Sequence, residues 1–329
     1  MLQILGYAGL LIVCFVILIK GADFLVEGAS DLARVLKIPA VIIGLTIVAF
    51  GTSAPEAGVS IASSVSGMNA LSISNVVGSN AFNLLVVVGL CAAIHEFPVD
   101  KDIRKRDYPL CILFTILLVI VSFDRQISRV EGVILFAFIV GYIILLIFDS
   151  LKSPAANEPD ELEKKAKDRP VTASRVLLDL LKVALSVGAI YLSSQGIVKS
   201  CSFFAKLFGV SDTIIGLTIV ALGTSLPELV TSIVASRKGE NAIAIGNVVG
   251  SNIFNILFVL GIASSISPVS NLSLANVIDT FICLAITLIC FIFVWFGKKF
   301  KRADGLIMLF IYVAYMVFVF LREFEIIML

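Results

Sequence analysis

Long apolar runs separated by short polar segments make up most of this 329-residue chain. An α-helix needs about 20 mostly apolar residues to cross the hydrocarbon core of a bilayer, which is roughly 30 Å thick. Ten runs come close to this length or exceed it, so the sequence predicts an all-α integral membrane protein with ten transmembrane helices. The predicted spans are residues 4–25, 40–63, 70–94, 108–123, 131–149, 174–198, 211–235, 242–265, 274–296 and 305–321.

The composition agrees with a membrane protein. Hydrophobic residues make up 59% of the chain and charged residues 15%. The mean hydropathy of +1.07 lies well outside the range of soluble globular domains. The lipid bilayer is therefore the expected environment. The net charge of +1 points to no charged partner, and we predict neither a nucleic-acid partner nor a protein partner.

The distribution of lysine and arginine predicts the orientation. The loops after the first, third, fifth, seventh and ninth spans hold about 18 of these residues, and the opposite side holds about five. Because positively charged loops stay in the cytoplasm, both termini should lie outside a cell (inner) membrane. The first span lacks a basic leading segment and a small-residue cleavage site, so we expect it to be retained.

Two sequence motifs occur twice, each time 172 positions apart. Residues 42–56 read IIGLTIVAFGTSAPE and residues 214–228 read IIGLTIVALGTSLPE, with 13 of 15 positions identical. Residues 75–83 read NVVGSNAFN and residues 247–255 read NVVGSNIFN. The chain is therefore an internal duplication that has kept the same polar residues in both halves.

The duplication predicts a first repeat at residues 1–149, a charged cytoplasmic linker at 150–172 and a second repeat at 173–329. Each repeat holds five predicted spans. Because five is an odd number, the second repeat should enter the membrane inverted relative to the first. Inverted-topology repeats are typical of secondary transporters, whose binding site lies near the bilayer midplane between the repeats.

Each copy of the first motif places an acid inside a membrane span, Glu56 in one repeat and Glu228 in the other. Such an acid is costly in the bilayer and normally faces protein or water, where it has a function. Pro55 and Pro227 precede the acids, and a proline leaves the carbonyl four residues earlier without its helical hydrogen bond. We therefore expect each of these spans to be interrupted beside its acid.

Hydroxyl and amide side chains accompany the acids at the same positions in both repeats. Thr52 and Ser53 should lie within a turn of Glu56, and we expect Ser79 and Asn83 to face the acid of their own repeat. The second repeat carries the equivalent residues Thr224, Ser225, Ser251 and Asn255.

These side chains supply only oxygen ligands. Such ligands suit a hard cation such as Ca²⁺ or Na⁺, whereas zinc and copper prefer nitrogen or sulfur. The same oxygens could also accept protons. A site that different cations occupy in competition is what an antiporter requires.

Other kinds of site find little support. The single histidine is His95, and the six cysteines are scattered without a CxxC pair, which argues against a zinc or thiol centre. We predict no catalytic residues, no cofactor and no enzymatic activity. A buried structural ion pair between the acids and Lys20 or Lys182 stays as an alternative.

The motifs GTSAPE and GTSLPE, each followed by NVVGSNxFN, resemble the α-repeats of the calcium/cation antiporter superfamily, especially the prokaryotic sodium/calcium exchangers. The resemblance covers the full chain. It implies exchange of Ca²⁺ for Na⁺ by alternating access, with the first and sixth spans sliding over the other eight. It also implies that Glu56 and Glu228 ligate both ions. The implied helper ligands are Thr52, Ser53, Ser79, Asn83, Thr224, Ser225, Ser251 and Asn255.

The ion requirement and the class of protein leave further alternatives open. Potassium-dependent relatives carry an acid where this chain has Asn255, so a K⁺ requirement is not implied. An H⁺-coupled Ca²⁺ or cation antiporter would use the same acids, although proton-coupled relatives place theirs in a GNxxE-like context. A cation channel would conduct without countertransport. Intramembrane proteases that use two acids carry paired aspartates, whereas these motifs carry glutamates and no aspartate.

Overall fold

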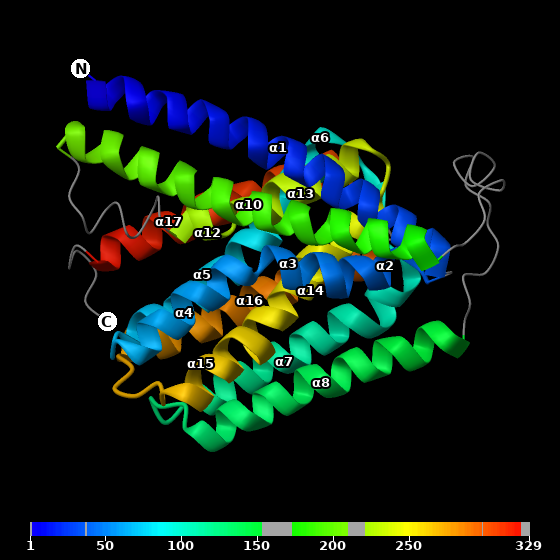
Figure 1. The fold of residues 1–329 in the computed structure, drawn as a ribbon. Helices are drawn as coiled ribbons and strands as arrows, with labels where there is room; N and C mark the ends of the chain where they lie inside the picture. Colours follow the sequence, from blue (N-terminus) through cyan, green and yellow to red (C-terminus); the bar gives the residue numbers. More distant parts are fainter. Residues whose placement is uncertain (1, 37, 153–172, 210–220, 298, 324–329) are drawn as a thin grey trace.

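The computed structural model describes residues 2–36, 38–152, 173–209, 221–297 and 299–323. These residues form helices apart from short turns and one pair of two-residue strands (Figure 1). In the first half the helices are α1 (Leu2–Leu36), α2 (Ala40–Ile43), η1 (Gly44–Val48), α3 (Ala49–Thr52), α4 (Ala54–Val65), α5 (Asn69–Phe82), η2 (Asn83–Val87), α6 (Val88–Ile94), η3 (Ile103–Asp107), α7 (Tyr108–Ser122) and α8 (Arg129–Lys152). In the second half they are α10 (Ala173–Leu207), α12 (Ala221–Thr224), α13 (Leu226–Arg237), α14 (Asn241–Phe254), η5 (Asn255–Leu260), α15 (Gly261–Ile266), α16 (Leu274–Gly297) and α17 (Arg302–Glu323). Segments labelled η are π-helical.

Seven of the described helices are long and apolar enough to cross a membrane, and the bent segment from α2 to α4 can count as an eighth. The chain is thus a multi-pass membrane protein. Two of the ten predicted spans are not among these eight. One is α7, which has 15 residues and continues directly from η3. The other is the predicted span 211–235, whose residues 211–220 lie outside the described part.

The helices α1 and α10 are longer than the spans predicted at 4–25 and 174–198. Each has 35 residues, which at 1.5 Å per residue is about 50 Å and exceeds the bilayer core. The hydropathy pattern ends at the charged residues, but helical hydrogen bonding continues past them. The two spans predicted here were therefore shorter than the helices.

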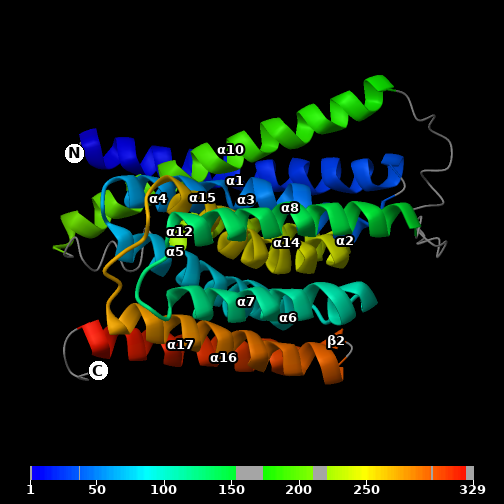
Figure 2. The same ribbon diagram turned by 90° about the horizontal axis from the view of Figure 1, so that it is seen from below.

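α1 and α10 lie side by side along one face of the other helices (Figures 1 and 2). Gly21 of α1 lies against Ile190 of α10, and Gly28 lies against Val183. The contacts run in opposite directions along the two helices, so α1 and α10 are antiparallel. This is the relation that equivalent helices of inverted repeats would have.

α14 forms the centre of the remaining helices, and every residue from Ile243 to Phe254 is buried. It packs along α2, η1 and α3 with very close backbone approach. A Cβ atom added at Gly250 would lie 2.7 Å from the carbonyl oxygen of Leu45, too close for any side chain. The glycine therefore lets the two repeats pack directly against each other, backbone to backbone.

The strands β1 (Phe97–Pro98) and β2 (Lys299–Phe300) pair antiparallel and join the end of α6 to the α16–α17 connection. Beside them Lys299 Nζ donates to Glu96 Oε2 at 2.8 Å. This hydrogen bond, together with the charge of the ammonium, holds the pKa of Glu96 below its ordinary value.

Candidate cation-binding site

The helix carrying the first motif is interrupted just before its acid. α3 ends at Thr52, α4 begins at Ala54, and the axis bends by 47° between them. In the second repeat α12 ends at Thr224 and α13 begins at Leu226. Both interruptions fall where the prolines remove a backbone N–H, so the predicted breaks are confirmed.

Each break places a glutamate in the first turn of the following helix, Glu56 in α4 and Glu228 in α13. Both residues are fully buried, with 0% relative exposure. Within the described residues, neither carboxylate forms a salt bridge. Two buried carboxylates are therefore present without a basic partner in the described part of the chain.

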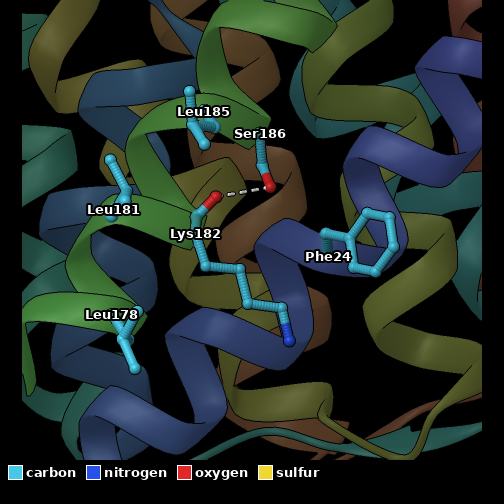
Figure 3. Close-up of a pocket in the computed structure, with 6 residues that line it drawn as sticks. All are labelled: Phe24, Leu178, Leu181, Lys182, Leu185 and Ser186. Atoms are coloured by element: carbon cyan, nitrogen blue, oxygen red, sulfur yellow. Dashed lines mark hydrogen bonds between the residues drawn. The ribbon is translucent and has the colours of Figure 1, made fainter. Parts of the chain in front are cut away.

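The two lysines considered as partners of the acids lie elsewhere. Lys182 faces an open groove on the outside of α1 and α10, with its ammonium 5.6 Å from the ring centre of Phe24 (Figure 3). It pairs with Glu27 at 3.0 Å. Lys20 is exposed and lies 4.0 Å from Asp23. The alternative of a structural pair between these lysines and the buried glutamates is therefore wrong.

Serine hydroxyls connect the two repeats through the carboxylates. Each carboxylate accepts hydrogen bonds at Oε1 from one serine of its own repeat and from one serine of the other. The bonds run from Ser79 to Glu56 (3.4 Å), from Ser225 to Glu56 (3.1 Å), from Ser251 to Glu228 (3.3 Å) and from Ser53 to Glu228 (3.2 Å).

Ser53 therefore differs from the prediction, which expected it beside Glu56. It is the residue between α3 and α4, with φ −80° and ψ 6°, so its side chain leaves the helical face that would carry it toward Glu56. Thr52 also points across the repeats, and its hydroxyl donates to Asn247 Oδ1 at 3.0 Å. Thr224, the equivalent of Thr52, is buried at the end of α12.

Two asparagines support the acid-bearing helices from behind. Asn75 Nδ2 donates to the main-chain oxygen of Glu56 at 3.2 Å, and Asn247 Nδ2 donates to that of Glu228 at 3.4 Å. The sequence interpretation did not select either residue. Both are the first residue of the duplicated motif NVVGSNxFN, and this repeated position could have identified them.

Four more asparagines form a symmetric cluster between α5 and α14. Asn80 and Asn252 each donate to the main-chain oxygen of the other at 3.2 Å. Asn83 Nδ2 donates to Asn252 Oδ1 at 3.1 Å, and Asn255 Nδ2 donates to Asn80 Oδ1 at 3.0 Å. The prediction expected Asn83 and Asn255 to face the acid of their own repeat. Their amides instead donate to asparagines of the opposite repeat. The prediction also missed Asn80 and Asn252.

Four oxygen atoms in this region have no hydrogen-bond partner among the described residues, although they are buried. They are Glu56 Oε2, Glu228 Oε2, Asn83 Oδ1 and Asn255 Oδ1. Each belongs to a side chain whose other polar atom is already bonded. Buried acceptors normally find a donor or a cation, because leaving them unpaired costs free energy. Carboxylate and amide oxygens are ligands that Ca²⁺ accepts.

Comparison with known proteins finds relatives that match almost the whole chain. The sequence model of the sodium/calcium exchanger protein family matches residues 6–148 and 179–321, one match in each half. An Alkalimonas amylolytica protein named as an antiporter, CaxA, is 38% identical over 94% of this chain and 97% of its own length. The sodium/calcium exchanger MaX1 of Methanosarcina acetivorans is 33% identical over 94% and 97%.

A solved structure has the same fold. The sodium-calcium exchanger NCX_Mj, soaked with Na⁺ and no Ca²⁺, superposes with a TM-score of 0.82 at 27% identity, covering 95% of this chain and 99% of its own. The family model matches both halves of the chain, and the relatives and the solved structure match 94–95% of its length. The chain therefore belongs to the sodium/calcium exchanger family.

Proposed function

We propose that the protein is a secondary antiporter that exchanges Ca²⁺ for Na⁺ by alternating access, with both ions using one site near the midplane. The observation that carries this proposal is the set of four buried oxygen atoms without donors, two from carboxylates and two from amides. Two carboxylates balance the charge of one Ca²⁺. Release of the ion leaves those charges buried, so another cation has to replace it.

The proposed ligands of the transported ions are Glu56 and Glu228. The hydroxyls and amides around them help to form the site: Thr52, Ser53, Ser79, Asn83, Thr224, Ser225, Ser251 and Asn255. Asn75, Asn247, Asn80 and Asn252 act as positioning residues, because they bond to the ligand-bearing side chains or to their backbone.

The proposed architecture has ten spans in two inverted repeats, residues 1–149 and 173–329, joined by a cytoplasmic linker at 150–172. Residues 150–152 of that predicted linker are the end of α8, and residues 153–172 lie outside the described part of the chain. The antiparallel pairing of α1 and α10 supports it. So do the crossed serine bonds, which relate each repeat to the other in the same way. We place both termini outside the cell (inner) membrane, from the distribution of lysine and arginine.

Two features favour Na⁺ as the coupling ion. The relative MaX1 is named a sodium/calcium exchanger, and the matched NCX_Mj structures carry Na⁺, Ca²⁺ or Sr²⁺ soaks. H⁺-coupled exchange is the second candidate, because the name of CaxA specifies an antiporter but no coupling ion.

The test is transport in proteoliposomes loaded with Na⁺. Uptake of radioactive Ca²⁺ is measured with an outward Na⁺ gradient, with a pH gradient alone, and with neither. Accumulation driven only by the Na⁺ gradient is the expected result. Accumulation driven only by the pH gradient would replace Na⁺ with H⁺ as the coupling ion. Passive Ca²⁺ flux without countertransport would identify a channel and overturn the proposal.

A further inference from the structure

Two ion pairs join α1 to the turn between α13 and α14. Arg34 lies in the last turn of α1, and its Nη2 donates to Glu240 Oε1 at 3.0 Å. Lys238 Nζ lies 3.3 Å from Asp23 Oδ1 and donates to the main-chain oxygen of Asp23 at 2.9 Å. We call Arg34–Glu240 and Asp23–Lys238 the α1–α13 ion pairs.

Apolar packing accompanies these pairs at the same end of the molecule. The hydrophobic cluster built mainly from α1 and α10 also takes in four residues of α13 and no described residue of α4. The four residues are Leu226, Val230, Val234 and Ala235. In the described structure α1 packs along α13, whereas α10 has no comparable packing on α4, the equivalent helix of the first repeat. One end of the interface is therefore closed more tightly than the other.

The sequence shows that this difference between the ends is built into the chain. If the repeats were equivalent here, matching ion pairs would join α10 to the turn after α4. Instead, the positions equivalent to Asp23, Arg34, Lys238 and Glu240 hold Gln195, Lys206, Ser66 and Met68. Neither pairing, Gln195 with Ser66 or Lys206 with Met68, joins opposite charges.

We propose that the α1–α13 ion pairs hold the transport path closed at the end where α1 finishes, so that the resting protein favours opening toward the opposite side. The inference rests on the proposed function, in which α1 and α10 slide together over the other helices. Such sliding separates α1 from α13 and breaks both pairs. It leaves the Lys182–Glu27 pair intact, because α1 and α10 move together.

The charges around the pairs agree with this role. Arg34 also lies 3.3 Å from Asp31 of its own helix, and Asp23 lies 4.0 Å from Lys20. When the α1–α13 pairs break, these neighbours can hold the α1 charges, which lowers the cost of opening. Exposed pairs are individually weak, and two of them shift an equilibrium between about 2-fold and 30-fold. A bias of that size still permits transport.

The experiment measures opening directly. Ala235 is fully buried where α13 meets α1, so a cysteine introduced there should react with a maleimide only when this end opens. The full-length protein in nanodiscs carries Ala235→Cys with Cys201→Ser, because Cys201 is the one native cysteine that is not buried. Labelling rates are compared for this parent and for the same protein with Asp23→Asn and Glu240→Gln.

We expect labelling to rise between about 2-fold and 30-fold when both pairs are removed. Lys182→Gln is the matched control, since it breaks a pair of similar length inside the moving unit and should leave labelling unchanged.

An unchanged rate in the double variant would overturn the proposal, as would an equal rise in the Lys182→Gln control. Ca²⁺ uptake by the unmodified protein is measured in parallel. Failure of that exchange would count against the proposed function, whereas normal exchange with unchanged labelling would count against the ion pairs alone.

Discussion

Replacing Glu56 with glutamine tests the site most directly, because the change keeps the shape and removes one charge. Oε1 of Glu56 accepts from Ser79 and Ser225, and the amide oxygen of glutamine can accept the same two bonds. The amide nitrogen would then stand where Oε2 now has no donor, so a proton donor replaces a cation ligand. The bound ion would face one carboxylate instead of two.

The size of the effect follows from the burial of the acids. Removing one partner from a buried charged pair costs about 3–5 kcal/mol, because the other charge remains uncompensated. At about 1.4 kcal/mol for each factor of ten, Ca²⁺ affinity should fall between about 10²-fold and 10³-fold or more. Without ions the variant should be more stable than the unmodified protein, because one buried charge is gone.

Thermal unfolding in detergent, with and without Ca²⁺, measures both effects. A Ca²⁺ concentration 100 times the dissociation constant should stabilise the unmodified protein by about 2.7 kcal/mol, and the same concentration should do almost nothing for the variant. Glu27→Gln is the control, because Glu27 is 54% exposed on the outer face of α1. Glu56→Gln with full stabilisation by Ca²⁺ would refute the assignment of Glu56 as a ligand.

Two further pairs of variants use the duplication as an internal control. Ser53→Ala and Ser225→Ala should each weaken Ca²⁺ activation of transport by about 10-fold or more, since each removes one hydrogen bond to a charged group at nearly the same distance. A loss in only one of the two would contradict the symmetry of the site. Gly250→Ala should destabilise the protein by about 1–3 kcal/mol in thermal unfolding, because its Cβ would collide with the Leu45 carbonyl. Gly78→Ala, at the equivalent position, should leave the stability unchanged, because nothing lies within 4 Å of the added Cβ. Equal losses of stability in the two variants would show that the close packing at Gly250 is not the cause.

Helix positions and breaks were the parts of the fold that the sequence predicted well. Apolar length predicted where helices lie, and the prolines predicted the breaks beside Glu56 and Glu228, because both effects are local. The full lengths of α1 and α10 were missed, since helices can continue through charged residues once they pass the bilayer boundary. The π-helical segments were also missed, because they have no distinct apolar period.

Sequence reasoning singled out side chains that lie close together in the structure, but it did not predict which of them bond to each other. The duplication singled out the acids, serines and asparagines. The spacing of 172 residues between the two copies identifies equivalent positions, but it does not show which residues are in contact. Contacts between repeats depend on how the repeats pack, and a packing made by glycines such as Gly250 leaves little pattern in the sequence. For this reason the bonds from Ser53 to Glu228 and from Asn83 to Asn252 were not predicted.

The crossed serine bonds have a consequence for how the protein is made. During synthesis Glu56 enters the membrane well before Ser225, its donor from the other repeat, has been translated. Until then its carboxylate has only Ser79 as a described donor, so the first repeat alone is an unfinished insertion intermediate with a costly buried acid. Coexpression of the two repeats as separate chains should therefore rescue a first repeat that is degraded when it is made alone.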